Sequence, residues 1–135
     1  MDSCHVLQSI PGFADAQVIR KLAQGITGRT FLVRRAMQDY VLRLRSDEAA
    51  LFVADGFAEH EFAGAAYAAG LAPEPIFCSA DRQVLLRRFS SGQVWSESLL
   101  TADRLGTLAR LLGRLHQIPV EPVSHDWAEE VLLRY

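Results

Sequence analysis

The chain is 135 residues long, the size of one ordinary domain, and 50% of its residues are hydrophobic, which is enough to fill a single core. Lys and Arg total 14 and Asp and Glu total 16, so the net charge is −2 and no basic excess is present to neutralise a nucleic-acid backbone. These values argue against two full domains and against nucleic acid as the main partner.

The two cysteines suggest neither a disulfide framework nor a metal site. Cys4 and Cys78 lie far apart, with no CxxC spacing and no neighbouring histidine cluster. The N-terminus lacks a basic segment followed by an apolar run, and no stretch approaches the roughly 18 apolar residues of a membrane span. We therefore expect a cytoplasmic protein that does not insert into a membrane.

Three strands are predicted in the first third of the chain. Residues 16–23 form the first, and a reversal at Gly25 and Gly28 leads into 30–34, which is rich in β-formers. A polar turn through Gln38 and Asp39 then leads into 40–44. Three consecutive antiparallel strands result, and the glycine reversal is a candidate glycine loop.

The amino-acid composition changes from Ser46 onward, where Ala and Glu become frequent and β-branched residues become rare. This composition predicts a short helix, a break at Asp55 and Gly56, and a second helix that is predicted more strongly than the first. Gly70 ends that helix as a C′ glycine, and the prolines that follow prevent its resumption.

The remaining elements complete an α+β pattern. Residues 76–79 and 84–89 are short apolar runs that suggest a hairpin, which brings the predicted sheet to five strands. Leucines at helical spacing predict a long helix over 102–116, and a proline-bearing connector follows it. Residues 127–135 begin another amphipathic helical stretch. No internal repeat is present.

One face of the third strand could hold phosphate. A strand, a glycine turn and two further strands with an inward cation form a known solution for covering nucleotide phosphates. Alternation along residues 40–45 places Arg43 on the same face as Val41, so Arg43 is the candidate phosphate contact. A cation under a sheet needs a carboxylate beside it. Glu59 and Glu61 on the following helix are rivals, because side chains two positions apart point about 200° from one another.

These pieces, taken in order, resemble a known family. The segments are GITGRTF from Gly25, then YVLRL, GLAPEPIF, VLLRRFSSGQVW and LARLLGRLHQIP. The series looks like the N-terminal lobe of the aminoglycoside phosphotransferase and choline or thiamine kinase superfamily, over nearly all of residues 12–119. The resemblance implies a protein-kinase-like N-lobe over 1–89, with a five-stranded antiparallel sheet and a helix. It assigns 90–135 to a hinge and the first helices of an incomplete, truncated C-lobe.

The resemblance also implies an ATP site. Arg43 occupies the position of the third-strand cation, which is often Arg in choline and thiamine kinase-like members, and Glu59 falls where the helix carboxylate lies. The glycine loop contacts phosphates and the hinge contacts the adenine edge through backbone groups, while an apolar roof covers the base. The implied residues are Gly25, Ile26, Thr27 and Gly28 in the loop, Ile26, Val33 and Val41 in the roof, and Arg88, Phe89 and Ser90 in the hinge. Family members often carry Asn where this chain has Gly28.

The sequence supplies no catalytic residue or metal ligand by the same comparison. Phosphoryl transfer in the superfamily uses an Asp that orients the acceptor, an Asn, and a second Asp on Mg²⁺, all from the C-terminal lobe. The chain contains no asparagine, and His125-Asp126 lacks the glycine and the downstream Asn of the catalytic loop. Mg²⁺ is therefore expected only together with that lobe. Of Arg87 and Arg88, one side chain is expected inward and one in solvent, with no base-reading role.

Two main hypotheses and a weaker third remain open. In the first, the chain supplies the nucleotide site of an ATP-dependent phosphotransferase for a small hydroxylated acceptor such as choline, thiamine, an aminoglycoside or a sugar. In the second, it is a non-catalytic module that forms a homodimer or binds a protein partner, which would cover Leu112, Leu115, Val131 and Leu132. In the third, an unrelated α+β domain reached this pattern by chance.

Overall fold

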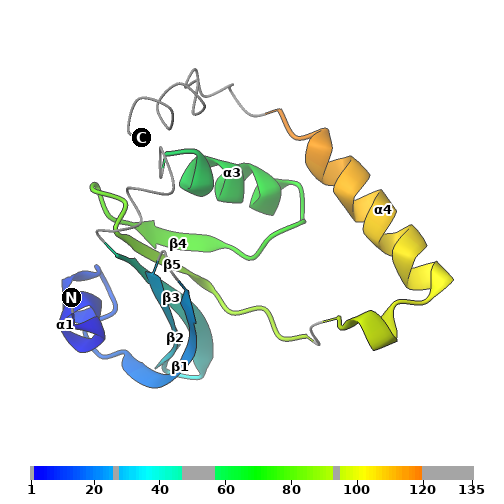
Figure 1. The fold of residues 1–135 in the computed structure, drawn as a ribbon. Coiled ribbons are helices and arrows are strands. Elements are labelled where there is room, and N and C mark those ends of the chain that lie inside the picture. The colour runs from blue at the N-terminus through cyan, green and yellow to red at the C-terminus, as the bar shows by residue number, and fades with distance from the viewer. Residues whose placement is uncertain (1, 26–27, 47–56, 93–94, 120–135) are drawn as a thin grey trace, which may run out of the picture.

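The computed structural model describes residues 2–25, 28–46, 57–92 and 95–119. Its centre is a five-stranded sheet in the order β1-β2-β3-β5-β4, and every neighbouring pair is antiparallel (Figure 1). The strands are β1 (Gln17–Gly25), β2 (Gly28–Arg35), β3 (Gln38–Arg45), β4 (Pro75–Cys78) and β5 (Val84–Arg88). The helices are α1 (Ser3–Ser9), α3 (Phe57–Ala68), the short 3-10 helix η1 (Glu97–Leu99) and α4 (Ala102–His116). The predicted α+β class with five antiparallel strands is confirmed.

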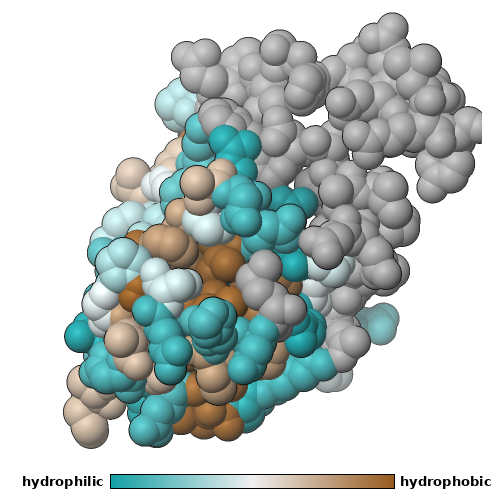
Figure 2. All heavy atoms as spheres, turned by 90° about the vertical axis from the view of Figure 1, so that its left-hand side faces the viewer, coloured by the Kyte–Doolittle hydropathy of each residue, from teal (hydrophilic) through white to brown (hydrophobic). Residues whose placement is uncertain are grey.

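The main core lies on the face of the sheet that α1 covers, which we name the α1 face. Alternate residues of β3 point to it, and Leu42 and Leu44 are 0% and 1% exposed. Val6 and Leu7 of α1 pack into the same cluster. Phe13 extends it by an edge-on contact with Tyr40, with ring centroids 4.9 Å apart. Figure 2 shows this side of the molecule, where hydrophilic residues form most of the surface and hydrophobic ones are visible between them.

The helix α1 was not anticipated from the sequence. Asp2 caps its start, since the Asp2 side chain accepts a hydrogen bond of 3.2 Å from the Cys4 amide. Val6, Leu7 and Ile10 then follow at helical spacing and are each at most 4% exposed. A capping residue followed by this short apolar pattern was the available signal. The consequence of α1 is that one face of the sheet is closed, which leaves the other face for a site.

The β2–β3 hairpin turns over two residues, Ala36 and Met37, and pairs Arg35 with Gln38. Ala36 has φ 52°, in the left-handed region that such a tight turn requires. Met37 at the tip is 96% exposed. Below the tip, Asp39 accepts hydrogen bonds of 2.7 and 3.0 Å from two nitrogens of Arg34. This turn fixes the register of β3 and therefore the face to which each of its side chains points.

The helix α3 lies along the opposite face, which we name the α3 face (Figure 1). It stops as predicted at Gly70, which has φ 70° and donates from its amide to the Tyr67 carbonyl at 2.8 Å. The predicted short helix after Ser46 and the helical stretch over 127–135 lie outside the described residues.

The helix α4 has the predicted bounds, and Thr101 caps it by accepting from the Arg104 amide. It stands apart from the sheet in Figure 1, and Arg114 connects it to the end of α3 by a 2.7 Å hydrogen bond to the Ala69 carbonyl. Among the described helices, none has the length and apolar content needed to cross a membrane.

Candidate nucleotide site

The α3 face of β3 carries the predicted cation. The register of the sheet places Thr30 and Leu32 of β2 opposite Arg43 and Val41, respectively. On the other side of β3, Arg43 pairs with Leu85 of β5. Residues that pair directly across antiparallel strands point to the same face. Arg43 therefore rises from the middle of the α3 face, between Thr30 and Leu85.

Arg43 forms an ion pair with Glu59, in which its Nη1 atom donates to the carboxylate. The side chains are 32% and 41% exposed, so solvent screens the pair and its contribution to stability is small. Its effect is to fix the guanidinium in place, since Glu59 stands in the first turn of α3. Glu61 is exposed. The expectation that only one of the two helix carboxylates can reach Arg43 is confirmed, and that residue is Glu59.

The two predicted loop glycines face each other where the β1–β2 hairpin closes. Gly25 pairs with Gly28, and Gly28 pairs with Arg45 on its other side. A Cβ atom on Gly28 would lie 2.3 Å from the carbonyl oxygen of Leu44. The backbone of β3 thus occupies the space that a side chain at this position needs. Ile26 and Thr27 lie outside the described residues.

The predicted apolar roof needs one correction. Val41 lies on the α3 face and is 7% exposed, in agreement with its predicted placement. Val33 pairs with Tyr40, lies in the α1-face core and is 0% exposed, so it cannot contact a ligand on the opposite face. Leu32, which pairs with Val41, holds that place. Val33 was assigned to the roof from the family resemblance alone, and because consecutive residues of a strand point to opposite faces, the residue of β2 beside Val41 is Leu32 and not Val33.

The predicted hinge has two of its amides already engaged. The Arg88 amide donates to the Glu74 carbonyl at 2.9 Å, and the Phe89 amide donates to the Asp39 carbonyl at 3.0 Å. A backbone N–H has one proton to donate. Of the three predicted hinge residues, Ser90 is therefore the one whose amide these two bonds leave available to a ligand. Ser90 is exposed. The carbonyls retain acceptor capacity, because each carbonyl oxygen has two lone pairs.

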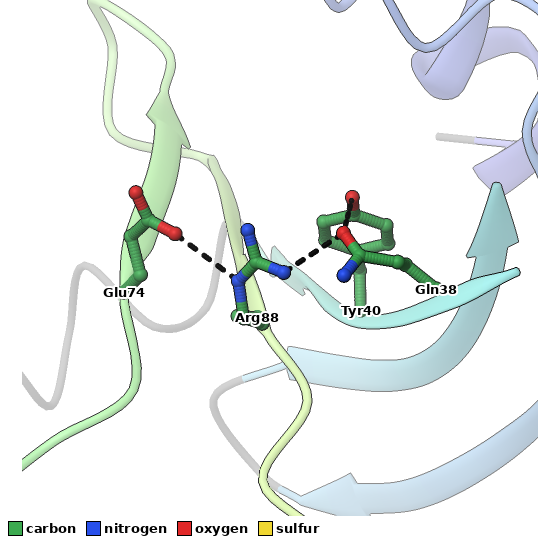
Figure 3. A network of polar contacts seen from close by, with 4 residues as sticks. All are labelled: Gln38, Tyr40, Glu74 and Arg88. Atoms are coloured by element: carbon green, nitrogen blue, oxygen red, sulfur yellow. Dashed lines mark hydrogen bonds and ion pairs between the residues drawn. The ribbon is translucent and has the colours of Figure 1, made fainter. Parts of the chain in front are cut away.

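The Arg88 side chain holds the start of the hinge (Figure 3). Its Nε atom donates to Glu74 at 3.1 Å, and its Nη1 atom donates to Gln38 at 2.8 Å. The Tyr40 hydroxyl donates to the same Gln38 oxygen at 3.1 Å. This network connects β3, β5 and the segment before β4. The side chain of Arg88 thus has a structural role, and because its amide is also engaged, only its carbonyl remains for a ligand.

A small, open cavity of about 50 Å³ lies between α3 and the sheet. Its walls are largely apolar, and its polar groups come from both elements. The lining includes Val41, Arg43, Glu59, His60, Ala63 and Arg87. An apolar hollow with a few convergent polar groups is the usual form of a small-molecule site. The ion pair of Arg43 and Glu59 stands in its wall.

The nearby thiol is not an activated nucleophile. Cys78 pairs with Leu85 and so lies on the α3 face of β4, where burial raises the pKa of its thiol above the ordinary value. The thiol is therefore protonated at neutral pH. In the part of the chain that the structure describes, no group of three or more His, Cys, Asp or Glu side chains could hold a metal ion.

Comparison with known proteins places this geometry in a family. No curated protein matches the chain. Among solved structures, an ethanolamine kinase from Plasmodium vivax matches with a TM-score of 0.65 at 15% sequence identity, over 96% of this chain. The chain spans 34% of that kinase, and at this identity the likeness shows a shared fold. A sequence model described as the phosphotransferase enzyme family matches residues 18–135. This match and the kinase-like fold confirm the resemblance seen in the sequence: the chain belongs to the phosphotransferase enzyme family.

Proposed function

We propose that this chain forms the nucleotide-binding part of an ATP-dependent phosphotransferase that acts on a small hydroxylated molecule. The observation that carries the proposal is the ion pair of Arg43 and Glu59 on the α3 face. It holds a guanidinium, which is always charged and matches phosphate geometry, beside an apolar cavity and a glycine-flanked hairpin. Family membership supports the reaction class.

Each part of ATP has a suitable counterpart in this arrangement. The triphosphate would lie against Arg43 and the glycine loop, with Glu59 keeping the guanidinium extended toward it. The base would lie against Val41 and Leu32, with the amide of Ser90 and the carbonyl of Arg88 at its polar edge. ATP supplies the transferable phosphoryl group. We assign no residue of this site to the catalytic base or to Mg²⁺, whose ligands the resemblance places in a C-terminal lobe.

For the acceptor we propose only a chemical class and no single compound. The solved neighbour is an ethanolamine kinase, so small amino alcohols are the first acceptors to screen, ahead of sugars and aminoglycosides. Selection of the acceptor is a property of the site and not of the fold.

Isothermal titration with ATP and Mg²⁺ tests the proposal. Arg43→Ala should weaken ATP binding roughly tenfold or more, because a hydrogen bond to a charged group contributes about 1.5–3 kcal/mol. Arg110→Ala is the matched control, since Arg110 is an exposed arginine on α4 away from the sheet. Equal heats for the parent protein and Arg43→Ala would remove Arg43 from the phosphate site.

A second candidate function rests on α4. Leu105, Leu108, Leu111 and Leu112 are 49%, 37%, 40% and 43% exposed, an unusual number for one helix. A non-catalytic module that forms a homodimer through this surface would cover them. Light scattering coupled to gel filtration tests this function: a dimer that Leu112→Lys converts to a monomer supports it, and a parent protein that stays monomeric at high concentration contradicts it.

A further inference from the structure

Arg87 occupies a position that the proposed site has not yet used. It is the last residue of β5 on the α3 face, where it pairs with Val41, and it lines the cavity. The hinge begins directly after it: Arg88 points to the α1 face and Ser90 follows two residues later. If the base lies against Val41 with its polar edge toward Ser90, the Arg87 side chain borders that edge.

Arg87 also differs in its partners from the two other arginines of the proposed site, Arg43 and Arg88, and from Arg34 of β2. Arg34, Arg43 and Arg88 each form an ion pair with a carboxylate of the fold. Within the described residues, Arg87 forms none, and it is exposed. Its guanidinium is therefore available to a ligand, in contrast to that of Arg88, which Glu74 and Gln38 hold.

The chemistry of a guanidinium selects between purines. It has five N–H donors and no acceptor. Adenine presents a donor at position 6, its amino group, whereas guanine and hypoxanthine present an acceptor there, and arginine is the commonest partner of that oxygen. A donor-only side chain is complementary to the oxygen and gains nothing from the amino group.

We propose that Arg87 recognises the 6-oxo group of a purine, so that the site binds 6-oxopurine nucleoside triphosphates such as ITP and GTP in addition to ATP. This inference rests on the proposed nucleotide site. It revises the expectation that Arg87 has no base-reading role. ATP remains a ligand, because the Arg88 carbonyl can accept from its amino group and the exposed Arg87 side chain can turn aside.

The test compares dissociation constants for ATP and ITP, which differ in the base at position 6 and in the proton on its neighbouring ring nitrogen. Nitrogen-15 NMR titration suits weak binding and also reports the Arg87 Nε–H group directly. Arg87→Met keeps the aliphatic stem and removes the donors. It should weaken ITP roughly fivefold to tenfold, the scale of one base-edge hydrogen bond at an exposed position, and leave ATP within about twofold. Any effect of the hinge on the two bases is the same in both proteins and cancels in the ratio.

Two controls separate the possible outcomes. Arg110→Met removes the same charge from α4 and should leave the ratio of the two constants unchanged, and Arg87→Lys should retain part of the ITP affinity. If ATP binds saturably and the ratio of the ATP and ITP dissociation constants is the same in the parent protein and in Arg87→Met, this inference is overturned while the proposed function stands. If neither nucleotide binds the parent protein, the proposed function fails and this inference fails with it.

Discussion

Gly28→Ala is expected to destabilise the protein, although it adds only one methyl group. The new Cβ atom would lie 2.3 Å from the Leu44 carbonyl oxygen and 3.1 Å from the Arg45 Cα, whereas ordinary contact begins at 3.4 Å. The shortfall at the oxygen is 3.4 − 2.3 = 1.1 Å. Both atoms belong to the backbone of β3, so no side-chain rotation relieves the overlap, and the strands must separate.

The cost should be about 1–3 kcal/mol, the usual range for an overpacked position. For a chain of this size that corresponds to a fall of roughly 4–12 °C in melting temperature, which scanning calorimetry measures readily. Gly28→Asn, which installs the side chain that the family often has here, should cost at least as much.

Gly64→Ala is the matched control, because it makes the same chemical change with the opposite sign. Gly64 lies inside α3, and a Cβ atom there would meet nothing within 4 Å. Alanine favours a helix over glycine by about 0.8–1 kcal/mol, so this variant should melt slightly above the parent protein. A Gly28→Ala protein that melts with or above the parent would refute the reasoning, since it would show that β3 leaves room for a side chain.

Three further predictions concern individual side chains. Glu59→Gln should weaken ATP binding several-fold in isothermal titration because the cation of the site loses its anchor, whereas Glu61→Gln, two positions along the same helix, should not; equal losses would contradict a positioning role. The arginine hydrogen-bonded to Asp39 lowers the pKa of that carboxyl, so its stabilisation is present above the unfolded pKa of about 3.9 and is lost as the pH falls through the lower folded value. The urea midpoint should thus fall less between pH 5 and pH 2 in Asp39→Asn than in the parent. Iodoacetamide at pH 8 should modify the exposed Cys4 before Cys78, whose pKa is raised by burial, and mass spectrometry of the digest would reveal the opposite order.

The sequence was sufficient for the parts of the site that depend on local pattern. Period-2 alternation placed Arg43 and Val41 on one face, and helical geometry showed that Glu59 and Glu61 could not both reach that face. The register of β2 against β3 depends on where the turn between them begins. That turn consists of Ala36, which has a left-handed backbone, and the exposed Met37, and neither residue type is a strong turn signal. The resemblance alone assigned Val33 to the roof, whereas the observed register puts Leu32 beside Val41.

Other features of the site could be recognised only from the three-dimensional structure. The sequence showed only that glycine stands at position 28 where family members often carry Asn, and the backbone of β3 showed that a side chain does not fit there. The engaged amides of Arg88 and Phe89 are equally invisible in the sequence, because their partners, Glu74 and Asp39, lie in other segments. Sequence pattern identified the hinge, whereas the fold distinguishes which of its groups a ligand can reach.

The tip of the β2–β3 hairpin offers a practical route to these measurements. Met37 is 96% exposed, and the eight-residue strands place it roughly 25 Å from the Gly28 end of the sheet, at about 3.3 Å per residue. A fluorophore attached at Met37→Cys, with Cys4 replaced by Ser, would sit far from the phosphate end of the proposed site. Such a label could report the tumbling or self-association of the chain without occupying the surface under study.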